Sequence, residues 1–340
     1  MDLITRKQSI SASQGVVTSN HPIASSVGIS ILASGGNAFD AAVGTAFALS
    51  VVEPMMVGPF GAGFTNFFRP NEGFSTIDGY GSAPGEAFET MYKPLSNDLA
   101  QYFDVEDQLN QNGYLSAGTP GNLLAWTHLV GKYGNFPLEE VIQPSINIAR
   151  NGFRVTDYLS DIIKDNIAEL SNYKESANIY LQNGRAPEKG EIIKNSNYAL
   201  TLEGIAKYGA AYLHEGDLGK HIEDEMKKNG GLITLDDLKR QKIFYREPIV
   251  GNYKGYKINS VGPVSSGGIC LIQMLNILEN FNIEKYNIFD SERIHIISEI
   301  FKIVFADRYK YIGDPEYVKI PTNGLISKKY ALERANEINL

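Results

Sequence analysis

The sequence predicts an α+β protein in which helices pack against sheets within one domain. Small residues recur through two helical stretches near the N-terminus, at roughly 22–34 and 37–52. Strand-like runs lie near both ends of the chain, at 64–77 and 248–258. The middle of the chain, residues 156–230, has a mostly helical pattern. This order favours layers of helix against sheet.

The two N-terminal helices have clear start and stop signals. Gly35 and Gly36 stop the first, because glycine readily takes the left-handed conformation at a helix end. Asn37 caps the second helix, and Pro54 ends it by removing a backbone donor. The small side chains of both helices allow a close approach to a neighbouring helix or sheet.

A hairpin follows the second helix. Phe64–Phe68 reads as a strand, residues 70–73 as a turn and Phe74–Ile77 as the returning strand. Residues 85–117 are mixed and loop-rich, and a short helix is expected near 96–108.

The remaining elements are predicted from periodicity and capping. Helices are expected from Ala117–Gly121 to Tyr133, over 138–151 with Gly152 as its stop, and from Thr234, where an acid three residues later completes a capping box. A hairpin over 248–258 precedes a helix from Ser265 to about Phe281. In the last long helix, 291–311, one apolar face is predicted from five residues: Ile294, Ile297, Phe301, Val304 and Phe305.

Composition bounds the function. The 340 residues carry a net charge of −8 without charge blocks, which argues against a nucleic-acid surface. No apolar run is long enough to span a bilayer, and the first residues lack the apolar core of a secretory signal. We therefore expect a cytoplasmic protein, with export after removal of a leader as the alternative. Cys270 stands alone in an apolar run and is read as a buried thiol.

Several sequence blocks together resemble the gamma-glutamyltransferase family, and the resemblance covers nearly the whole chain. Each block is weak alone, but their order is specific. They are Ser34–Ala42, Val51–Pro54, Gly58–Phe64, Gly118–Gly121, Lys132–Gly134, Leu138–Pro144, Ala149–Phe153, Gly230–Thr234, Tyr253–Tyr256, Pro263–Gly268, Asn276–Glu279 and Ala306–Pro315.

The resemblance implies an N-terminal-nucleophile hydrolase with a four-layer αββα sandwich. Residues 1–340 would form one large-subunit domain of mostly helical outer layers plus part of the central sheets. The precursor would cleave itself before a threonine, whose hydroxyl attacks an amide and whose α-amino group is the base. That threonine belongs to the family's small subunit, so we expect no catalytic nucleophile in this chain. The resemblance implies no metal and no cofactor.

One position departs from the family pattern. Large subunits of gamma-glutamyltransferases carry an arginine that grips the substrate α-carboxylate, and Tyr80 occupies its place in Asp78–Pro84. Arginine offers a charged fork, whereas tyrosine offers one neutral hydroxyl. Tyr80 is therefore the predicted substrate-binding residue, expected to reshape the acyl pocket towards hydrolysis or another acyl group. The alternative is that Tyr80 only fills space at a strand end.

The other candidate residues are predicted to have structural roles. Ser265–Gly268 is read as a helix cap rather than an anion site. Glu53 is read as a backbone cap rather than a site residue, and Asp307–Arg308 as a structural polar set. The histidines show no metal-like spacing, and Thr127–His128 lies mid-helix.

Three functions stay open. The first is the large subunit of a self-processed enzyme that cleaves a gamma-glutamyl, glutathione-like amide, paired with a small subunit from the same precursor. The second is an acylase or amidase of the cephalosporin-acylase-like branch. The third is a non-catalytic scaffold without a nucleophile. A dimer of heterodimers is a further assembly that the resemblance allows.

Overall fold

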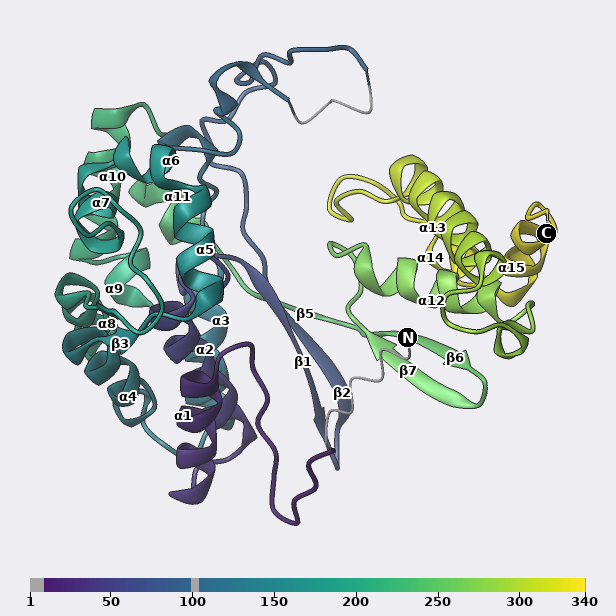
Figure 1. Ribbon diagram of the computed structural model, residues 1–340, viewed down its shortest axis with the longest axis horizontal. Helices are drawn as coiled ribbons and strands as arrows, with labels where there is room; N and C mark the ends of the chain where they lie inside the picture. The colour runs from purple at the N-terminus through teal and green to yellow at the C-terminus, as the bar shows by residue number, and fades with distance from the viewer. Residues whose placement is uncertain (1–8, 99–103, 340) are drawn as a thin grey trace. The chain divides into compact units, whose positions relative to one another are not determined.

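A computed structural model describes residues 9–98 and 104–339 (Figure 1). Its contacts divide the chain into two compact units. The first comprises Met1–Gly63 and Gly79–Ile243, and the second comprises Phe64–Asp78 and Phe244–Leu340. The expected single large-subunit domain, completed by a second chain, stays a prediction.

The first unit is mainly helical and the second mixes sheet and helix. The first contains α1 (Pro22–Ala33), α2 (Ala38–Val52), α3 (Asn122–Tyr133), α4 (Leu138–Asn151), α5 (Asp157–Asp165), α6 (Ile167–Ser171), α7 (Lys174–Tyr180), α8 (Ser196–Tyr208), α9 (Ala211–His214), α10 (Asp217–Asn229) and α11 (Leu235–Arg240), with the short β3 (Phe153–Arg154) and β4 (Ile192–Ile193). The second contains β1 (Gly63–Arg69), β2 (Gly73–Gly79), β5 (Phe244–Arg246), β6 (Ile249–Tyr253), β7 (Tyr256–Ser260), α12 (Gly267–Leu278), α13 (Ser291–Tyr311), α14 (Thr322–Leu325) and α15 (Lys328–Ala335).

The N-terminal helices form as predicted. The Asn37 side chain accepts from the backbone of Phe39 and Asp40, and Asp40 accepts from the Asn37 N–H, which completes a capping box. A Cβ on Gly28 would lie 2.3 Å from Thr45 Oγ1, so α1 and α2 pack together only because this residue lacks a side chain. The core of the first unit is built around α2, which packs on α1, α3 and α4.

The predicted helices of the middle and the later hairpin are confirmed. Gly152 ends α4 with φ +90°, a conformation that favours glycine. Thr234 and Asp237 form the capping box of α11. Strands β6 and β7 pair antiparallel from Ile249↔Ser260 to Tyr253↔Tyr256. In the other sheet of the second unit, β2 lies between β1 and β5.

One element predicted in the loop-rich stretch lies partly outside the described residues. The short helix expected near 96–108 falls partly on residues 99–103, which lie outside the described residues. Around that gap, Pro94 and Val105 form an isolated bridge, and only Glu106–Gln108 make a 3₁₀ turn.

The predicted apolar face of α13 is wrong. The buried residues of this helix are Ile296, Ile300, Ile303, Val304 and Asp307. Of the predicted face only Val304 is fully buried, whereas Ile294, Phe301 and Phe305 are exposed within the described chain. The reason is that α13 carries two apolar stripes, and periodicity alone does not say which one faces α12.

The polar set predicted at Asp307 and Arg308 is present. Asp307 Oδ2 accepts from Gln273 Nε2 at 2.6 Å and from the Tyr330 hydroxyl at 2.9 Å, and Arg308 Nε donates to Ser266 Oγ at 3.0 Å. These bonds tie α13 to α12 and α15. Cys270 is buried beside them, and burial raises the pKa of its thiol.

Candidate acyl-binding pocket

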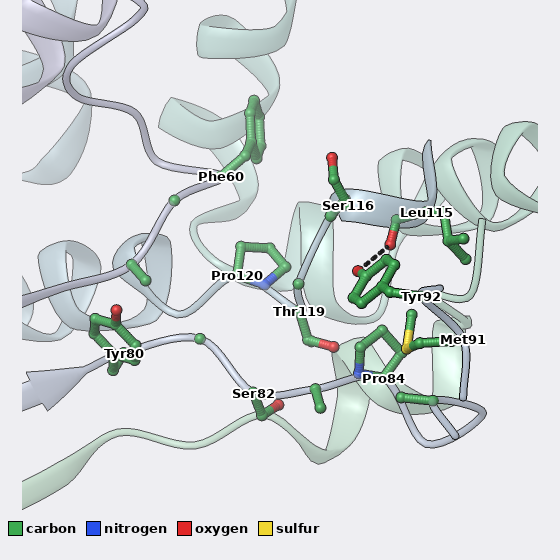
Figure 2. Close-up of a pocket in the computed structure, with 17 residues that line it drawn as sticks. Phe60, Tyr80, Ser82, Pro84, Met91, Tyr92, Leu115, Ser116, Thr119 and Pro120 are labelled. Atoms are coloured by element: carbon green, nitrogen blue, oxygen red, sulfur yellow. Dashed lines mark hydrogen bonds between the residues drawn. The ribbon is translucent and has the colours of Figure 1, made fainter. Parts of the chain in front are cut away.

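Tyr80 lines a cavity of about 450 Å³ in the first unit (Figure 2). Four chain segments build its walls: the turn after α2 around Phe60, the stretch that follows β2 from Tyr80 to Pro84, the loop from Ala87 to Tyr92, and the stretch before α3 from Leu115 to Pro120. Figure 2 shows Tyr80 towards one end of the pocket and Met91, Tyr92 and Leu115 towards the other.

Backbone hydrogen bonds fix the walls to one another. Ser82 and Thr119 exchange two N–H···O=C bonds, of 3.1 and 2.9 Å, as an antiparallel bridge. The N–H groups of Gly121 and Asn122 both donate to the Gly61 carbonyl at 3.1 Å. The pocket wall is therefore set by main-chain geometry rather than by flexible side chains.

The Gln241 side chain bonds to two residues of the Tyr80 stretch. Its Nε2 donates to the Tyr80 carbonyl at 2.8 Å, and its Oε1 accepts from Ser82 Oγ at 2.7 Å. Asp237 acts similarly a little further on, where its Oδ1 accepts from the Gly85 N–H at 2.8 Å. Residues far away in the sequence thus position the backbone that carries Tyr80.

Glycines permit the close approach of these segments. A Cβ on Gly81 would lie 2.9 Å from the Thr119 carbonyl oxygen, and one on Gly121 would lie 2.4 Å from the Gly79 carbonyl oxygen. Real Cβ atoms do not come so close to a backbone oxygen. Gly81 is therefore required by the packing of this wall.

The pocket is neutral. None of the described residues that line it carries a charged side chain. Its apolar surface comes from Phe60, Met91, Leu115 and prolines, and its hydroxyls come from Tyr80, Tyr92, Ser82, Ser116 and Thr119. The Tyr92 hydroxyl donates to the Leu115 carbonyl at 3.0 Å, so it fixes the far wall (Figure 2).

Two hydroxyl-bearing residues of this wall differ in exposure. The Tyr80 residue is 50% exposed, so its side chain can contact a ligand. Thr119 is fully buried, and its hydroxyl has no hydrogen-bond partner among the described residues. A buried hydroxyl without a partner is costly.

Other residues singled out in the sequence do not join this pocket. Glu53 accepts from Asn20 Nδ2 at 3.1 and 2.9 Å, and it lines a separate cavity of about 550 Å³ with His21. Thr127 Oγ1 bonds to the Leu123 carbonyl of its own helix at 2.8 Å.

The start of α12 is held by short-range bonds. Ser265 Oγ accepts from the Gly267 N–H at 3.1 Å. The hydroxyl of Ser266, the N-cap residue, accepts a hydrogen bond from Arg308 Nε. This agrees with a structural role. Within residues 9–98 and 104–339, no group of three His, Cys, Asp or Glu side chains is placed to hold a metal ion.

Sequence reasoning found Tyr80 but missed most of its surroundings. Met91, Tyr92 and Gln241 carried no signal, because their roles depend on a chain path that local patterns do not encode. Gly118–Gly121 is predicted as a turn before a helix and as a block of the family resemblance, and neither signal shows that it supplies the opposite wall of the pocket.

Comparison with known proteins shows the family and the fold of this chain. The chain belongs to the gamma-glutamyltranspeptidase family, whose model matches residues 24–340. It is 41% identical over 333 residues to the acylase ACY 1 proenzyme of Pseudomonas sp. (strain SE83), covering 98% of this chain and 60% of that protein. It is 38% identical over 332 residues to the glutathione hydrolase proenzyme of Escherichia coli (strain K12), covering 97% and 56%.

A solved structure shares the fold. The gamma-glutamyltranspeptidase of Helicobacter pylori superposes with a TM-score of 0.91 at 34% identity, covering 98% of this chain and 94% of that one. The chain thus has the mixed α/β gamma-glutamyltranspeptidase fold of the N-terminal-nucleophile hydrolases. It spans 60% and 56% of the length of the two curated relatives, both proenzymes. No helix among the described residues is long and apolar enough to cross a membrane.

Proposed function

We propose that this chain is the large-subunit part of a self-processed amidohydrolase, and that the Tyr80 pocket receives the acyl group of its substrate. The amide carbonyl carbon would be attacked by a threonine hydroxyl at the start of a second subunit cut from the same precursor. The C–N bond then breaks, the amine leaves with the proton, and water or an acceptor amine releases the acyl group from the threonine. Family membership and the two proenzyme relatives support this proposal.

The first candidate acyl group is gamma-glutamyl. The glutathione hydrolase relative, 38% identical, supports it. A gamma-glutamyl group carries an ammonium and a carboxylate. Because the described lining of the pocket is uncharged, the second subunit would have to supply the partners of both charges.

The second candidate is an acyl group without the α-carboxylate. It is favoured by the single observation that Tyr80 and its neighbours present only hydroxyls and apolar surface. A neutral hydrogen bond contributes about 0.5–1.5 kcal/mol net, against about 1.5–3 kcal/mol for one to a charged group. The acylase relative, 41% identical, supports this candidate as well.

A substrate pair separates the two candidates. The product of the complete gene is assayed on gamma-glutamyl-p-nitroanilide and on 4-aminobutanoyl-p-nitroanilide, which lacks the α-carboxylate. A gamma-glutamyl enzyme prefers the first strongly, whereas the second candidate accepts both. A product that neither splits into two chains on a denaturing gel nor releases nitroaniline from any anilide would contradict the proposal and favour a scaffold.

Substitution of Tyr80 tests its role directly. In Tyr80→Arg, preference for the substrate with the α-carboxylate should rise by about tenfold to a few hundredfold, because a charged fork replaces one hydroxyl. Tyr80→Phe is the matched control: it keeps the ring and loses only the hydroxyl, so it should lower the preference by no more than about tenfold. If Tyr80→Arg has the wild-type kcat/KM on both anilides, Tyr80 only fills space.

A further inference from the structure

A second cavity of the first unit contains a buried carboxylate that the proposed function does not use. The cavity has a volume of about 550 Å³ and is lined from the start of α1, the end of α2 and the start of α5. All of its lining residues belong to the first unit, and it shares none of them with the Tyr80 pocket. Its polar lining residues are Asn20, His21, Glu53, Thr156 and Tyr158.

Glu53 is the residue on which the cavity's charge depends. It is only 2% exposed, and Asn20 Nδ2 donates to its two carboxylate oxygens at 3.1 and 2.9 Å. Within residues 9–98 and 104–339, Glu53 forms no ion pair. A neutral amide offsets only part of the cost of taking a carboxylate out of water. The described chain therefore buries a negative charge without providing a cation for it.

His21 does not supply that cation, although it lies beside Glu53. It is 4% exposed, and its Nδ1 accepts from the Ile23 N–H at 3.1 Å. A protonated imidazole has no acceptor, so this bond requires the neutral ring with its proton on Nε2. Burial also lowers the pKa of His21, outweighing the opposite influence of Glu53. Glu53 is thus the one charged group of the described cavity lining.

The geometry at Glu53 favours an ammonium group over other cations. Asn20 Nδ2 contacts both oxygens and so occupies the space between them. A guanidinium grips a carboxylate with its fork across both oxygens, whereas an ammonium needs only one outer lone pair. A metal ion would need further ligands, and the neutral ring of His21 offers it no free lone pair.

The remainder of the cavity suits an apolar body. Leu49, Met56 and Val57 supply aliphatic and thioether surface, and Tyr158 supplies an aromatic ring. The Tyr158 hydroxyl donates to Met56 Sδ at 3.7 Å, which joins the two walls that these residues form. An aromatic face attracts a nearby cation, and cavities of about 300–1,000 Å³ receive small organic molecules.

We propose that this cavity binds a small primary amine, with the ammonium group on Glu53 and the apolar body against Tyr158 and Met56. The proposal goes beyond the proposed function, because it uses no residue of the Tyr80 pocket and requires no chemical step. It assigns Glu53 a binding role that its place at the end of a helix does not suggest.

Binding of benzylamine to the complete gene product tests this, with benzyl alcohol as its neutral counterpart. Dissociation constants are measured by ligand-observed NMR titration near pH 7.5. We expect the alcohol to bind at least about tenfold more weakly than the amine, and Glu53→Gln to weaken the amine by a similar factor, since each removes a charge-assisted hydrogen bond.

Asp157→Asn is the matched control. Asp157 stands between two lining residues in the sequence, but its side chain is exposed and pairs with Lys189. Its loss removes the same charge from the same neighbourhood and should change the dissociation constant by less than about threefold, because water screens it. Tyr158→Leu keeps Glu53 and should weaken the amine by about twofold to fivefold, and it serves if Glu53→Gln folds poorly.

Three results would overturn the inference. Absence of benzylamine binding would leave the cavity to water. Equal binding to the wild type and to Glu53→Gln or Tyr158→Leu would place the amine elsewhere, and equal binding of amine and alcohol would show an apolar cavity in which Glu53 has no part. A selective loss in Glu53→Gln that Asp157→Asn does not share supports it, whether or not the product hydrolyses amides.

Discussion

Helices α2 and α13 show how differently the two units bury apolar surface. Helix α2 buries ten of its 15 residues, whereas α13 buries five of its 21. The first is surrounded by helices of its own unit and is made of small residues that let them approach closely. Within the described residues of its own unit, α13 shares a core with α12 and α15. Among the described residues, α2 is therefore enclosed on more sides than α13 is.

The largest effect is expected from a substitution that creates a cavity in the core of the first unit. Leu202 of α8 is fully buried against α4, so Leu202→Ala should lower the free energy of unfolding by about 2–5 kcal/mol. Leu200→Ala, on the same helix but 61% exposed, should change it by less than about 0.5 kcal/mol. Urea unfolding of the complete gene product, followed by circular dichroism, measures both. Similar midpoints for the two variants would show that the first unit does not depend on its own core.

A smaller effect is expected from filling space between α1 and α2. In Gly28→Ala the new methyl group meets Thr45 Oγ1 and Val17, so we expect a loss of about 1–3 kcal/mol. Gly131 of α3 has nothing within 4 Å of a built Cβ, so Gly131→Ala should stabilise the helix by about 0.5–1 kcal/mol. Melting temperatures of the two variants should therefore move in opposite directions, and a shift of the same sign would contradict the close packing.

The weakest test of the comparison uses pH. Burial lowers the pKa of His21 and of His214, outweighing the opposite influence of Glu53 on the first and of the Leu238 carbonyl on the second. Between these lowered values and the unfolded pKa of about 6.5, the unfolded chain binds more protons than the folded one. The free energy of unfolding should thus fall as the pH drops below about 6.5.

His214→Gln isolates one contribution. Nδ1 of His214 lies 2.8 Å from the Leu238 carbonyl, and because a carbonyl only accepts, this nitrogen carries the proton. A glutamine amide can replace the bond without titrating. Urea midpoints measured between about pH 7.5 and 5.5 should therefore depend less on pH in the variant than in the wild type. An unchanged slope would assign the acid sensitivity to other groups.

Local signals predicted most helices and strands, and the site only in part. Two helix starts are marked by capping boxes, Asn37 with Asp40 and Thr234 with Asp237. The two residues of each box lie three positions apart, so the local sequence contains the whole motif. The pocket is different. Gln241 reaches the Tyr80 carbonyl across 161 residues of chain, and no local pattern encodes that contact.

The sequence by itself determined the family, the order of the elements and the position of Tyr80, because these depend on residue identity and short-range spacing. Only the tertiary structure decided which stripe of α13 is buried and which segments enclose the pocket. Both stripes satisfy the helical period equally well. Burial depends on which neighbours the chain brings alongside, and those neighbours lie far away in the sequence.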